Sequence, residues 1–140
     1  MSEIVPLANE LRLAIHRLTR RMRQQHAPSD LTLTQISAMA ILWREGPMTA
    51  GELAAKEQVR PPSITRVVDS LERESLVRRT DSPTDGRQVL VRLTGLGNRR
   101  IEEYVKEREA WLAQQLTALS NEDREILAKA AVLLNDLASR

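Results

Sequence analysis

The chain has 140 residues and a formal net charge of only +2, from 21 basic and 19 acidic side chains. This length is typical of one domain or one elongated subunit, and it argues against a two-domain enzyme. The sequence contains no cysteine, which excludes disulfides, thiolate zinc sites, cysteine nucleophiles and thiol redox switches. Its only aromatic residues, Trp43, Tyr104 and Trp111, are too few for a protein that stacks single-stranded bases on aromatic side chains.

Neither a membrane segment nor a signal peptide is expected. Residues 1–23 carry charges scattered among apolar positions and contain no small-residue cleavage site. No apolar run approaches the roughly 20 residues that a membrane-spanning helix requires. We therefore expect a cytoplasmic protein without a membrane partner.

Two amphipathic helices are predicted first. Apolar residues at three- and four-residue steps from Ile4 to Leu18 share one face of the first helix. A basic stretch follows, and Ala27-Pro28-Ser29 breaks the helix. The second helix opens at residues 34–37 and ends before Gly46-Pro47, and its apolar side chains are Ile36, Met39, Ala40 and Trp43.

A short helix and a proline-initiated helix come next. Thr49 is the expected N-cap of the short helix because Glu52 lies three residues later, at the spacing of a capping box. Pro61 and Pro62 open the following helix, over residues 61–74, since a first turn has no helical partner for the missing N–H. Its apolar stripe comprises Ile64, Val67, Val68 and Leu71, and its polar stripe comprises Ser63, Arg66, Ser70 and Arg73.

The hydrophobic period then changes from 3.6 to 2 residues, which predicts a β-hairpin. Its strands are residues 76–80 and 88–93, joined by a turn over residues 81–86. Val89, Val91 and Leu93 alternate with their neighbours, so that one face can pack. A long helix is expected from about residue 98 to 119, and residues 120–123 cap a last helix. The predicted fold is mainly α with a small β-hairpin.

Two short helices, a tight turn between them and a following hairpin form the order of a winged helix-turn-helix. In that fold the second helix offers short polar or cationic side chains to the major groove of DNA. Ser63, Thr65 and Arg66 lie at the N-terminal end of this helix, and Arg60 directly precedes it. The helix N-terminus can also receive a phosphate. Arg79, on the first strand, is included in the predicted DNA-binding set. The alternative is that Ser63 only caps the helix and Arg66 is solvated.

The hairpin tip carries a second candidate contact. Arg87 follows the tip, where an exposed cation can enter a narrow minor groove that concentrates negative potential. Asp85 lies two residues earlier and can hold the guanidinium of Arg87, or of another arginine, in a fixed pose. The alternative is an ordinary surface ion pair, which contributes almost nothing to stability.

The segment from Asp85 to Gly97, DGRQVLVRLTGLG, closely resembles the wing signature of the multiple-antibiotic-resistance regulator (MarR) family: Asp-x-Arg, an alternating strand, then Leu-Thr-x-x-Gly. Residues 49–77 resemble the family's helix-turn-helix. The resemblance extends over nearly the whole chain in length and element order. It implies a two-fold dimer made by the N-terminal helix and the last two helices. It also implies binding of pseudo-palindromic double-stranded DNA, with Arg87 as the minor-groove arginine and Asp85 as its orienting partner.

The terminal helices favour a homodimer independently, because they carry more apolar surface than one small winged helix needs to cover. The predicted interface residues are Ile4, Leu7, Leu11, Ile126, Leu133, Leu134 and Leu137. The alternative is that these helices pack on each other inside one subunit. The resulting organisation is an N-terminal dimerisation helix (1–28), a winged helix-turn-helix domain (29–97) and C-terminal helices that complete the dimerisation region (98–140).

The small net charge hides an uneven distribution. Residues 52–100 hold ten basic against seven acidic side chains, whereas residues 101–140 hold five against eight. Residues 1–28 carry a net charge of +3 and residues 29–51 carry −1. Positive charge therefore lies on the proposed DNA-binding part, as binding to a phosphate backbone requires.

Nothing in the sequence indicates an enzyme, a cofactor or a metal site. There is no nucleophile elbow or P-loop, and His16 and His26 lie near no clustered carboxylates. Many members of the resembled family respond to phenolic or other aromatic acids. Candidates to line a pocket for such an effector are His16, Arg20, Met22, Met39 and Trp43. The alternative is that Met39 and Trp43 belong to the core.

The favoured function is a dimeric transcription regulator, a repressor released by a small-molecule ligand. The rival is a winged-helix adaptor that binds proteins and does not bind DNA. The dependence of duplex binding on salt discriminates between the two, because a DNA binder loses affinity steeply as salt rises.

Overall fold

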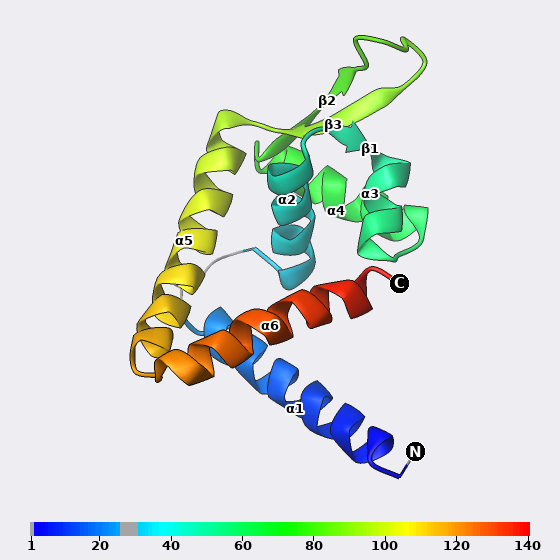
Figure 1. Cartoon of the computed structure of the whole chain (residues 1–140). Helices are drawn as coiled ribbons and strands as arrows, with labels where there is room; N and C mark the ends of the chain where they lie inside the picture. Colours follow the sequence, from blue (N-terminus) through cyan, green and yellow to red (C-terminus); the bar gives the residue numbers. More distant parts are fainter. Residues whose placement is uncertain (1, 26–30) are drawn as a thin grey trace. The chain divides into compact units, whose positions relative to one another are not determined.

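The computed structural model describes residues 2–25 and 31–140, and in these it contains six helices and three short strands (Figure 1). In chain order they are α1 (Ile4–Arg23), α2 (Leu33–Glu45), β1 (Met48–Thr49), α3 (Ala50–Glu57), α4 (Pro61–Arg73), β2 (Val77–Asp81), β3 (Val89–Leu93), α5 (Gly95–Thr117) and α6 (Asn121–Ala138). This confirms the mainly α fold with a small hairpin. The predicted helix break at residues 27–29 and the boundary between residues 28 and 29 lie outside the described residues.

The chain forms two compact units. One contains the described residues through 25 together with Lys106–Arg140, and the other contains residues 31–105. The division falls inside α5, between Val105 and Lys106, whereas the sequence placed it between residues 97 and 98. The first turns of α5 therefore belong with the hairpin that precedes them.

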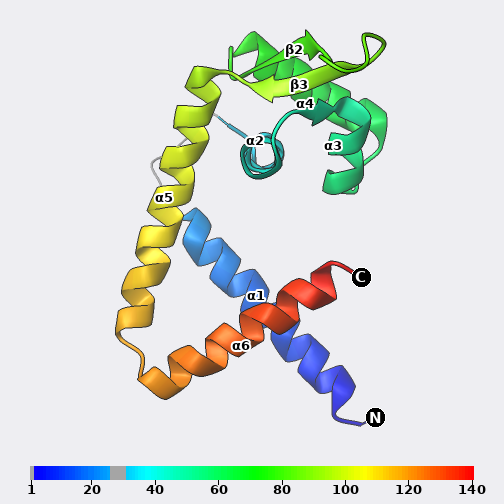
Figure 2. The same cartoon turned by 45° about the horizontal axis from the view of Figure 1, so that its top comes forward.

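The strands form one antiparallel sheet in the order β1-β3-β2. Val77 of β2 pairs with Leu93 of β3, and Met48 of β1 pairs with Val91 on the other edge of β3. Figure 2 shows β2 and β3 side by side, with α4 next to them. The sequence did not predict β1, because two residues are too short for an alternating pattern to be recognised.

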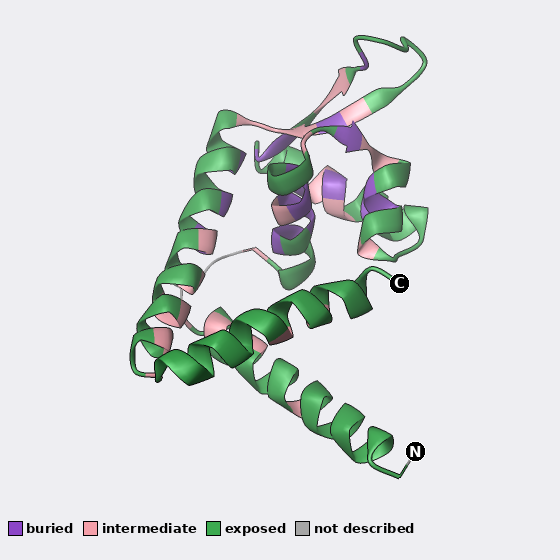
Figure 3. Ribbon diagram, viewed as in Figure 1, coloured by how far each residue is buried: buried purple, intermediate pink, exposed green. Residues whose placement is uncertain are grey.

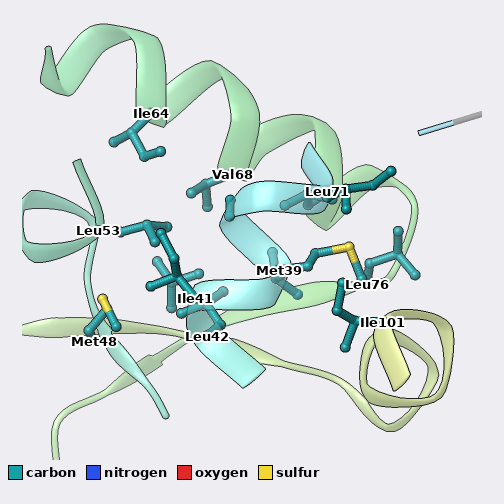
Figure 4. Packing of buried hydrophobic residues seen from close by; sticks show 14 of the residues in the cluster. Met39, Ile41, Leu42, Met48, Leu53, Ile64, Val68, Leu71, Leu76 and Ile101 are labelled. Carbon is teal, nitrogen blue, oxygen red and sulfur yellow. The ribbon is translucent and has the colours of Figure 1, made fainter. Parts of the chain in front are cut away.

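The core of the second unit lies between α2, α3, α4, the sheet and the start of α5. Ile64, Val68 and Leu71 of α4 are fully buried, and Figure 4 shows them pointing into this cluster. Each such side chain stabilises the fold by about 1.5–3 kcal/mol through removal of apolar surface from water. The predicted apolar stripe of α4 is therefore confirmed, although Val67 is only half-buried.

Side-chain caps set the starts of α2, α3 and α6. The Thr32 hydroxyl accepts from the Gln35 backbone amide at 3.2 Å, and the Gln35 side-chain Oε1 accepts from the Thr32 backbone amide at 2.8 Å. With this cap α2 begins earlier than predicted. Thr49 caps α3 as predicted, with its hydroxyl accepting from the Glu52 amide at 3.1 Å. Ser120 caps α6 in the same way.

The packing face of the hairpin is shorter than the alternation predicts. Val91 is buried at 1% exposure and Leu93 is half-buried, but Val89 is 47% exposed. Figure 1 shows the reason: the loop end of the hairpin projects away from α2, α3 and α4. Only the base of β3 has helices to pack on.

The base of the hairpin is locked to α5 by the Leu-Thr-x-x-Gly part of the signature. The Thr94 amide donates to the Leu76 carbonyl at 3.0 Å, and the Thr94 hydroxyl donates to the Ser75 carbonyl at 2.6 Å. The same hydroxyl accepts from the Gly97 amide at 3.0 Å and so caps α5. A Cβ at Gly97 would collide with the Leu76 carbonyl oxygen, so only glycine permits this close approach.

The first unit contrasts with the second because every described residue of α1 and α6 is at least partly exposed (Figure 3). In this unit α6 crosses α1 in both Figure 1 and Figure 2, and the Arg21 guanidinium lies 5.6 Å from the centre of the Trp111 ring. Of the predicted interface residues, Leu134 is half-buried, whereas the exposed ones are Ile4, Leu7, Leu11, Ile126, Leu133 and Leu137. None of the helices in the described ranges is long and apolar enough to span a membrane.

Two side-chain-bearing residues adopt left-handed backbone on either side of α4. Gln58 (φ 57°) lies in the turn between α3 and α4, and Ser75 (φ 62°) lies in the turn between α4 and β2. This conformation brings Cβ too close to the following carbonyl oxygen, at a cost of roughly 1–2 kcal/mol. The strained backbone at these two turns allows the chain to reverse between α3 and α4 and between α4 and β2.

Replacing Ser75 with glycine should therefore stabilise the protein. We expect Ser75→Gly to raise the free energy of unfolding by about 0.5–1 kcal/mol, the relief of strain less the larger unfolded-state entropy of glycine. Chemical denaturation monitored by circular dichroism measures this change. Ser75→Ala is the matched control, because it removes the hydroxyl but keeps Cβ, and it should not stabilise. A lower unfolding free energy for Ser75→Gly would show that the turn is not strained.

Candidate nucleic-acid interface

The exposed polar face of α4 gathers most of the residues predicted to contact DNA. Ser63, Thr65 and Arg66 are exposed, and Arg60 is the exposed N-cap of the helix. Their placement follows from burial of the opposite stripe, which fixes the rotation of α4 about its axis. The Thr65 hydroxyl donates to the Pro61 carbonyl at 3.0 Å, so both lone pairs of its oxygen remain available as acceptors.

The start of α4 is a poorer anion site than the sequence predicts. Pro61 and Pro62 carry no N–H, and the amides of Ser63 and Ile64 donate to the Arg60 carbonyl at 3.0 and 3.4 Å. Within this helix, all of which the structure describes, no amide of the first turn is left free to bind a phosphate. A phosphate near the start of α4 would therefore be attracted by cationic side chains such as Arg60 and not by backbone amides.

The loop of the hairpin, residues 82–88, is held by its own hydrogen bonds. The Ser82 hydroxyl is buried under the loop and accepts from the amides of Thr84 and Asp85 at 3.4 and 3.3 Å. The Ser82 amide donates to the Gln88 carbonyl, and the Gln88 amide donates to the Asp85 carbonyl, both at 3.0 Å. The loop is thus a preformed turn that presents Arg87 outward.

The role of Asp85 differs from the one predicted. Its Oδ1 accepts from the backbone amide of Arg87 at 3.0 Å, which is the hydrogen bond of an Asx-turn. Among the ion pairs of the described residues, none involves the Arg87 guanidinium. Asp85 therefore shapes the backbone under Arg87 and leaves the guanidinium exposed to solvent.

Arg79, which the sequence places among the DNA contacts, is paired with two carboxylates and is partly exposed. Its Nη2 lies 2.7 Å from Asp69 Oδ1 and its Nη1 lies 2.7 Å from Glu72 Oε1. Both carboxylates belong to α4, so the contact joins β2 to that helix. The hydrogen bond to Asp69 is the largest cause that raises the pKa of the Arg79 guanidinium; burial opposes the rise and the charges of Glu72 and Asp69 add to it.

A hydrogen bond between α2 and α4 was not predicted from the sequence. The Gln35 side chain is buried, and its Nε2 donates to the Ser70 hydroxyl at 2.9 Å, which in turn donates to the Val67 carbonyl at 2.7 Å. The sequence places Ser70 on the polar stripe of α4 without a partner. The Thr32-x-x-Gln35 capping-box spacing was the signal that could have placed the Gln35 side chain at the start of α2.

The residues predicted to line an effector pocket fall in both units. Arg20 Nη2 and His16 Nε2 are hydrogen-bonded at 2.9 Å on α1 in the first unit, where Met22 is half-buried. In the second unit Met39 is buried in the core at 1% exposure, whereas Trp43 is 38% exposed. Met39 thus serves the core, and Trp43 does not. Among residues 2–25 and 31–140, no three His, Asp or Glu side chains come together as metal ligands.

A tri-helical core, a three-stranded sheet and a projecting hairpin beside an exposed helix define a winged helix-turn-helix protein. A family model described as "MarR family" matches residues 31–89. An HTH-type transcriptional regulator of Mycobacterium tuberculosis is 44% identical over 128 residues, which is 91% of this chain and 90% of the relative. The chain belongs to the MarR family of DNA-binding transcription regulators.

Solved structures agree over the full length. A MarR family protein from Bacillus stearothermophilus superposes with a TM-score of 0.87 at 29% identity, covering 98% of this chain and 96% of its own. The Multiple Antibiotic Resistance Repressor, MarR, superposes with a TM-score of 0.76 at 26% identity, covering 94% of each chain. Both likenesses include the terminal helices as well as the winged helix-turn-helix.

The Asx-turn predicts different outcomes for two substitutions at Asp85. Asp85→Ala removes the acceptor and should speed hydrogen exchange of the Arg87 amide by about 3- to 10-fold, the equivalent of one ordinary hydrogen bond. Asp85→Asn keeps a side-chain carbonyl oxygen and should leave the exchange rate near that of the parent. Amide exchange followed by NMR measures both. Equal acceleration in the two variants would mean that the carboxylate charge, and not the Asx-turn, orders the loop.

Proposed function

We propose that this chain is a sequence-specific, homodimeric repressor that is released from DNA by a small-molecule ligand. The observation that carries the DNA-binding part is the joint exposure of two surfaces on one unit. These are the polar face at the start of α4 and the guanidinium of Arg87 on a preformed loop. Affinity selection from a random duplex pool, followed by footprinting upstream of the protein's own gene, tests sequence specificity.

In this proposal α4 enters the major groove and the hairpin loop enters a neighbouring minor groove. Arg66 has the donors for bidentate contact with guanine, and the free lone pairs of Thr65 accept from adenine or cytosine amino groups. Ser63 can contact either a base edge or a phosphate. Arg60 approaches the phosphate backbone, and Arg87 reads the narrow minor groove through its charge.

The homodimer is supported by the exposure of apolar side chains in the first unit. Ile4, Ile126 and Leu133 are each more than 60% exposed although they are large and aliphatic. Exposed large apolar side chains gathered on two helices favour an interaction surface. The alternative that α1 and α6 bury these faces on each other inside one subunit is disfavoured, because every described residue of both helices keeps exposed surface. Two-fold pairing would set the two recognition helices about 10 bp apart on pseudo-palindromic DNA.

Repression and relief by a ligand are proposed from the family and from one relative. The Multiple Antibiotic Resistance Repressor, MarR, shares the fold over most of both chains. A phenolic or other aromatic acid suits the paired Arg20 and His16 side chains, because a guanidinium binds a carboxylate strongly. The exposed indole of Trp43 is the aromatic candidate in the other unit.

The rival function, a winged-helix adaptor for another protein, predicts a different response to salt. If the protein binds duplex DNA, the logarithm of its affinity falls linearly with the logarithm of salt, with a slope of about −0.9 per neutralised phosphate. An adaptor shows no measurable affinity for any duplex, including at low salt. Fluorescence anisotropy with the selected duplex separates the two functions.

Removal of the exposed arginine on the hairpin should weaken DNA binding. We expect Arg87→Ala to reduce affinity for the selected duplex by on the order of 1–3 kcal/mol, because the variant loses a charged contact with the groove. Fluorescence anisotropy over a range of salt concentrations measures the loss. An affinity equal to that of the parent across this range would remove the hairpin from the DNA interface.

Arg124→Ala is the matched control for this experiment. It deletes the same charge from α6, two residues from Ile126 and therefore about 160° around the helix from that residue. It should leave both the affinity and the salt slope close to those of the parent. An equal loss in the two variants would indicate a general effect of net charge.

A charge placed on the apolar face of α6 should separate the protomers. We expect the parent to have twice its chain mass of 15.8 kDa, and Leu133→Glu to be a monomer, because burial of a carboxylate in an apolar interface is costly. Light scattering coupled to size-exclusion chromatography measures the mass. Ala128→Glu, on the opposite face of α6, is the control and should remain dimeric. A monomeric parent or a dimeric Leu133→Glu variant would contradict the assigned interface.

A further inference from the structure

The contact of Arg79 with α4 has a geometry that ordinary surface ion pairs lack. One guanidinium bridges two carboxylates of the same helix, each at 2.7 Å, and the backbone amide of Arg79 also donates to Glu72 Oε2 at 3.3 Å. Asp69 and Glu72 are three residues apart, so they share one face of α4. The bridge therefore adds a second restraint, from β2, on a helix whose rotation is set mainly by its buried stripe.

The two carboxylates lie on the continuation of the exposed face proposed to meet DNA. Asp69 follows Arg66 by three residues and Thr65 by four, the spacings that place helical side chains in one row. An unpaired carboxylate in this row would repel the phosphates of a bound duplex. The guanidinium of Arg79 reaches both carboxylates from the strand side and counters their charge.

We propose that Arg79 is a positioning residue for DNA recognition, which orients α4 and neutralises Asp69 and Glu72 without itself contacting DNA. This inference rests on the proposed function, because it assigns to Arg79 a role in the affinity of α4 for a duplex. It reassigns a cation that the sequence places among the DNA contacts. It also explains why a helix that approaches phosphates can carry two acidic side chains.

The bridge contributes little to folding, and this allows its effect on binding to be measured separately. The side chains of Arg79, Asp69 and Glu72 are 31%, 48% and 42% exposed. Ion pairs with this much access to solvent contribute between nothing and about 1 kcal/mol to stability. Arg79 variants should therefore fold, and their chemical denaturation curves should lie near that of the parent.

A double-mutant cycle on the full-length protein tests the proposal. Arg79→Ala is made in the parent and in the Asp69→Asn/Glu72→Gln background, and affinity for the selected duplex is measured by fluorescence anisotropy. Arg79→Ala should weaken binding about tenfold in the parent, a coupling typical of neighbouring charges, but less than about twofold once the carboxylates are gone. Arg79→Lys should give an intermediate loss in the parent, because a single ammonium does not bridge both carboxylates.

Each other outcome overturns the inference in a recognisable way. An equal loss on Arg79→Ala in both backgrounds would make Arg79 a direct DNA contact, and no loss in either would leave it without a role in binding. A loss that tracks a fall in unfolding free energy would make its role purely structural. If the parent itself bound no duplex at low salt, the proposed function would fail together with this inference. If the parent binds the duplex and Arg87→Ala weakens that binding, the proposed function stands. In that case a failed prediction for Arg79 contradicts only the role assigned to Arg79.

Discussion

The orientation of α4 about its own axis is the constraint on which the rest of the DNA-facing unit depends. Successive residues of a helix are rotated by about 100°, so a small error in rotation would move every exposed side chain away from its target. The fully buried stripe of Ile64, Val68 and Leu71 sets this rotation against the core. Gln35 holds the helix through Ser70, and Arg79 holds its acidic edge from the strand side.

The hairpin signature has a mainly structural meaning in this chain. At the tip, Asp85 forms an Asx-turn beneath Arg87. At the base, Thr94 ties the hairpin to the end of α4 and caps α5, while Gly97 permits the close approach of α5 to Leu76. Most residues of this motif therefore shape the backbone of the hairpin and its junction with α5. The motif leaves the Arg87 guanidinium exposed.

The two units differ in how they satisfy their apolar residues. The unit of residues 31–105 has a core of buried aliphatic side chains within one chain, whereas every described residue of α1 and α6 keeps exposed surface. An amphipathic helix in a globular protein is stabilised chiefly by packing of its apolar face. The exposed apolar side chains of α1 and α6 therefore favour contact with a partner surface. A second copy of the chain would supply such a surface with the same chemistry, which is the basis of the proposed homodimer.

Local features were open to prediction from the sequence because they act over three or four residues. The helical stripes, the Thr49 cap, the prolines that open α4 and the alternation of the hairpin all repeat within one turn or one strand. The hairpin signature also identified the family, which the comparisons confirm. The misplaced start of α2 is a local error, since the capping residue Thr32 lies just before the position predicted.

Partners between elements were decided only by the tertiary structure. Arg79 lies ten and seven residues from the two carboxylates that bind it, so no helical or strand period relates them. The two-residue strand β1 exists because β3 offers an edge, and Val89 is exposed because the helices end before the hairpin does. The sequence by itself determined which helices and which hairpin form and which residues share a face of each. Packing of those elements decided which charges neutralise one another and which, like that of Arg87, stay exposed, because the partner of a side chain depends on the distance between elements in space.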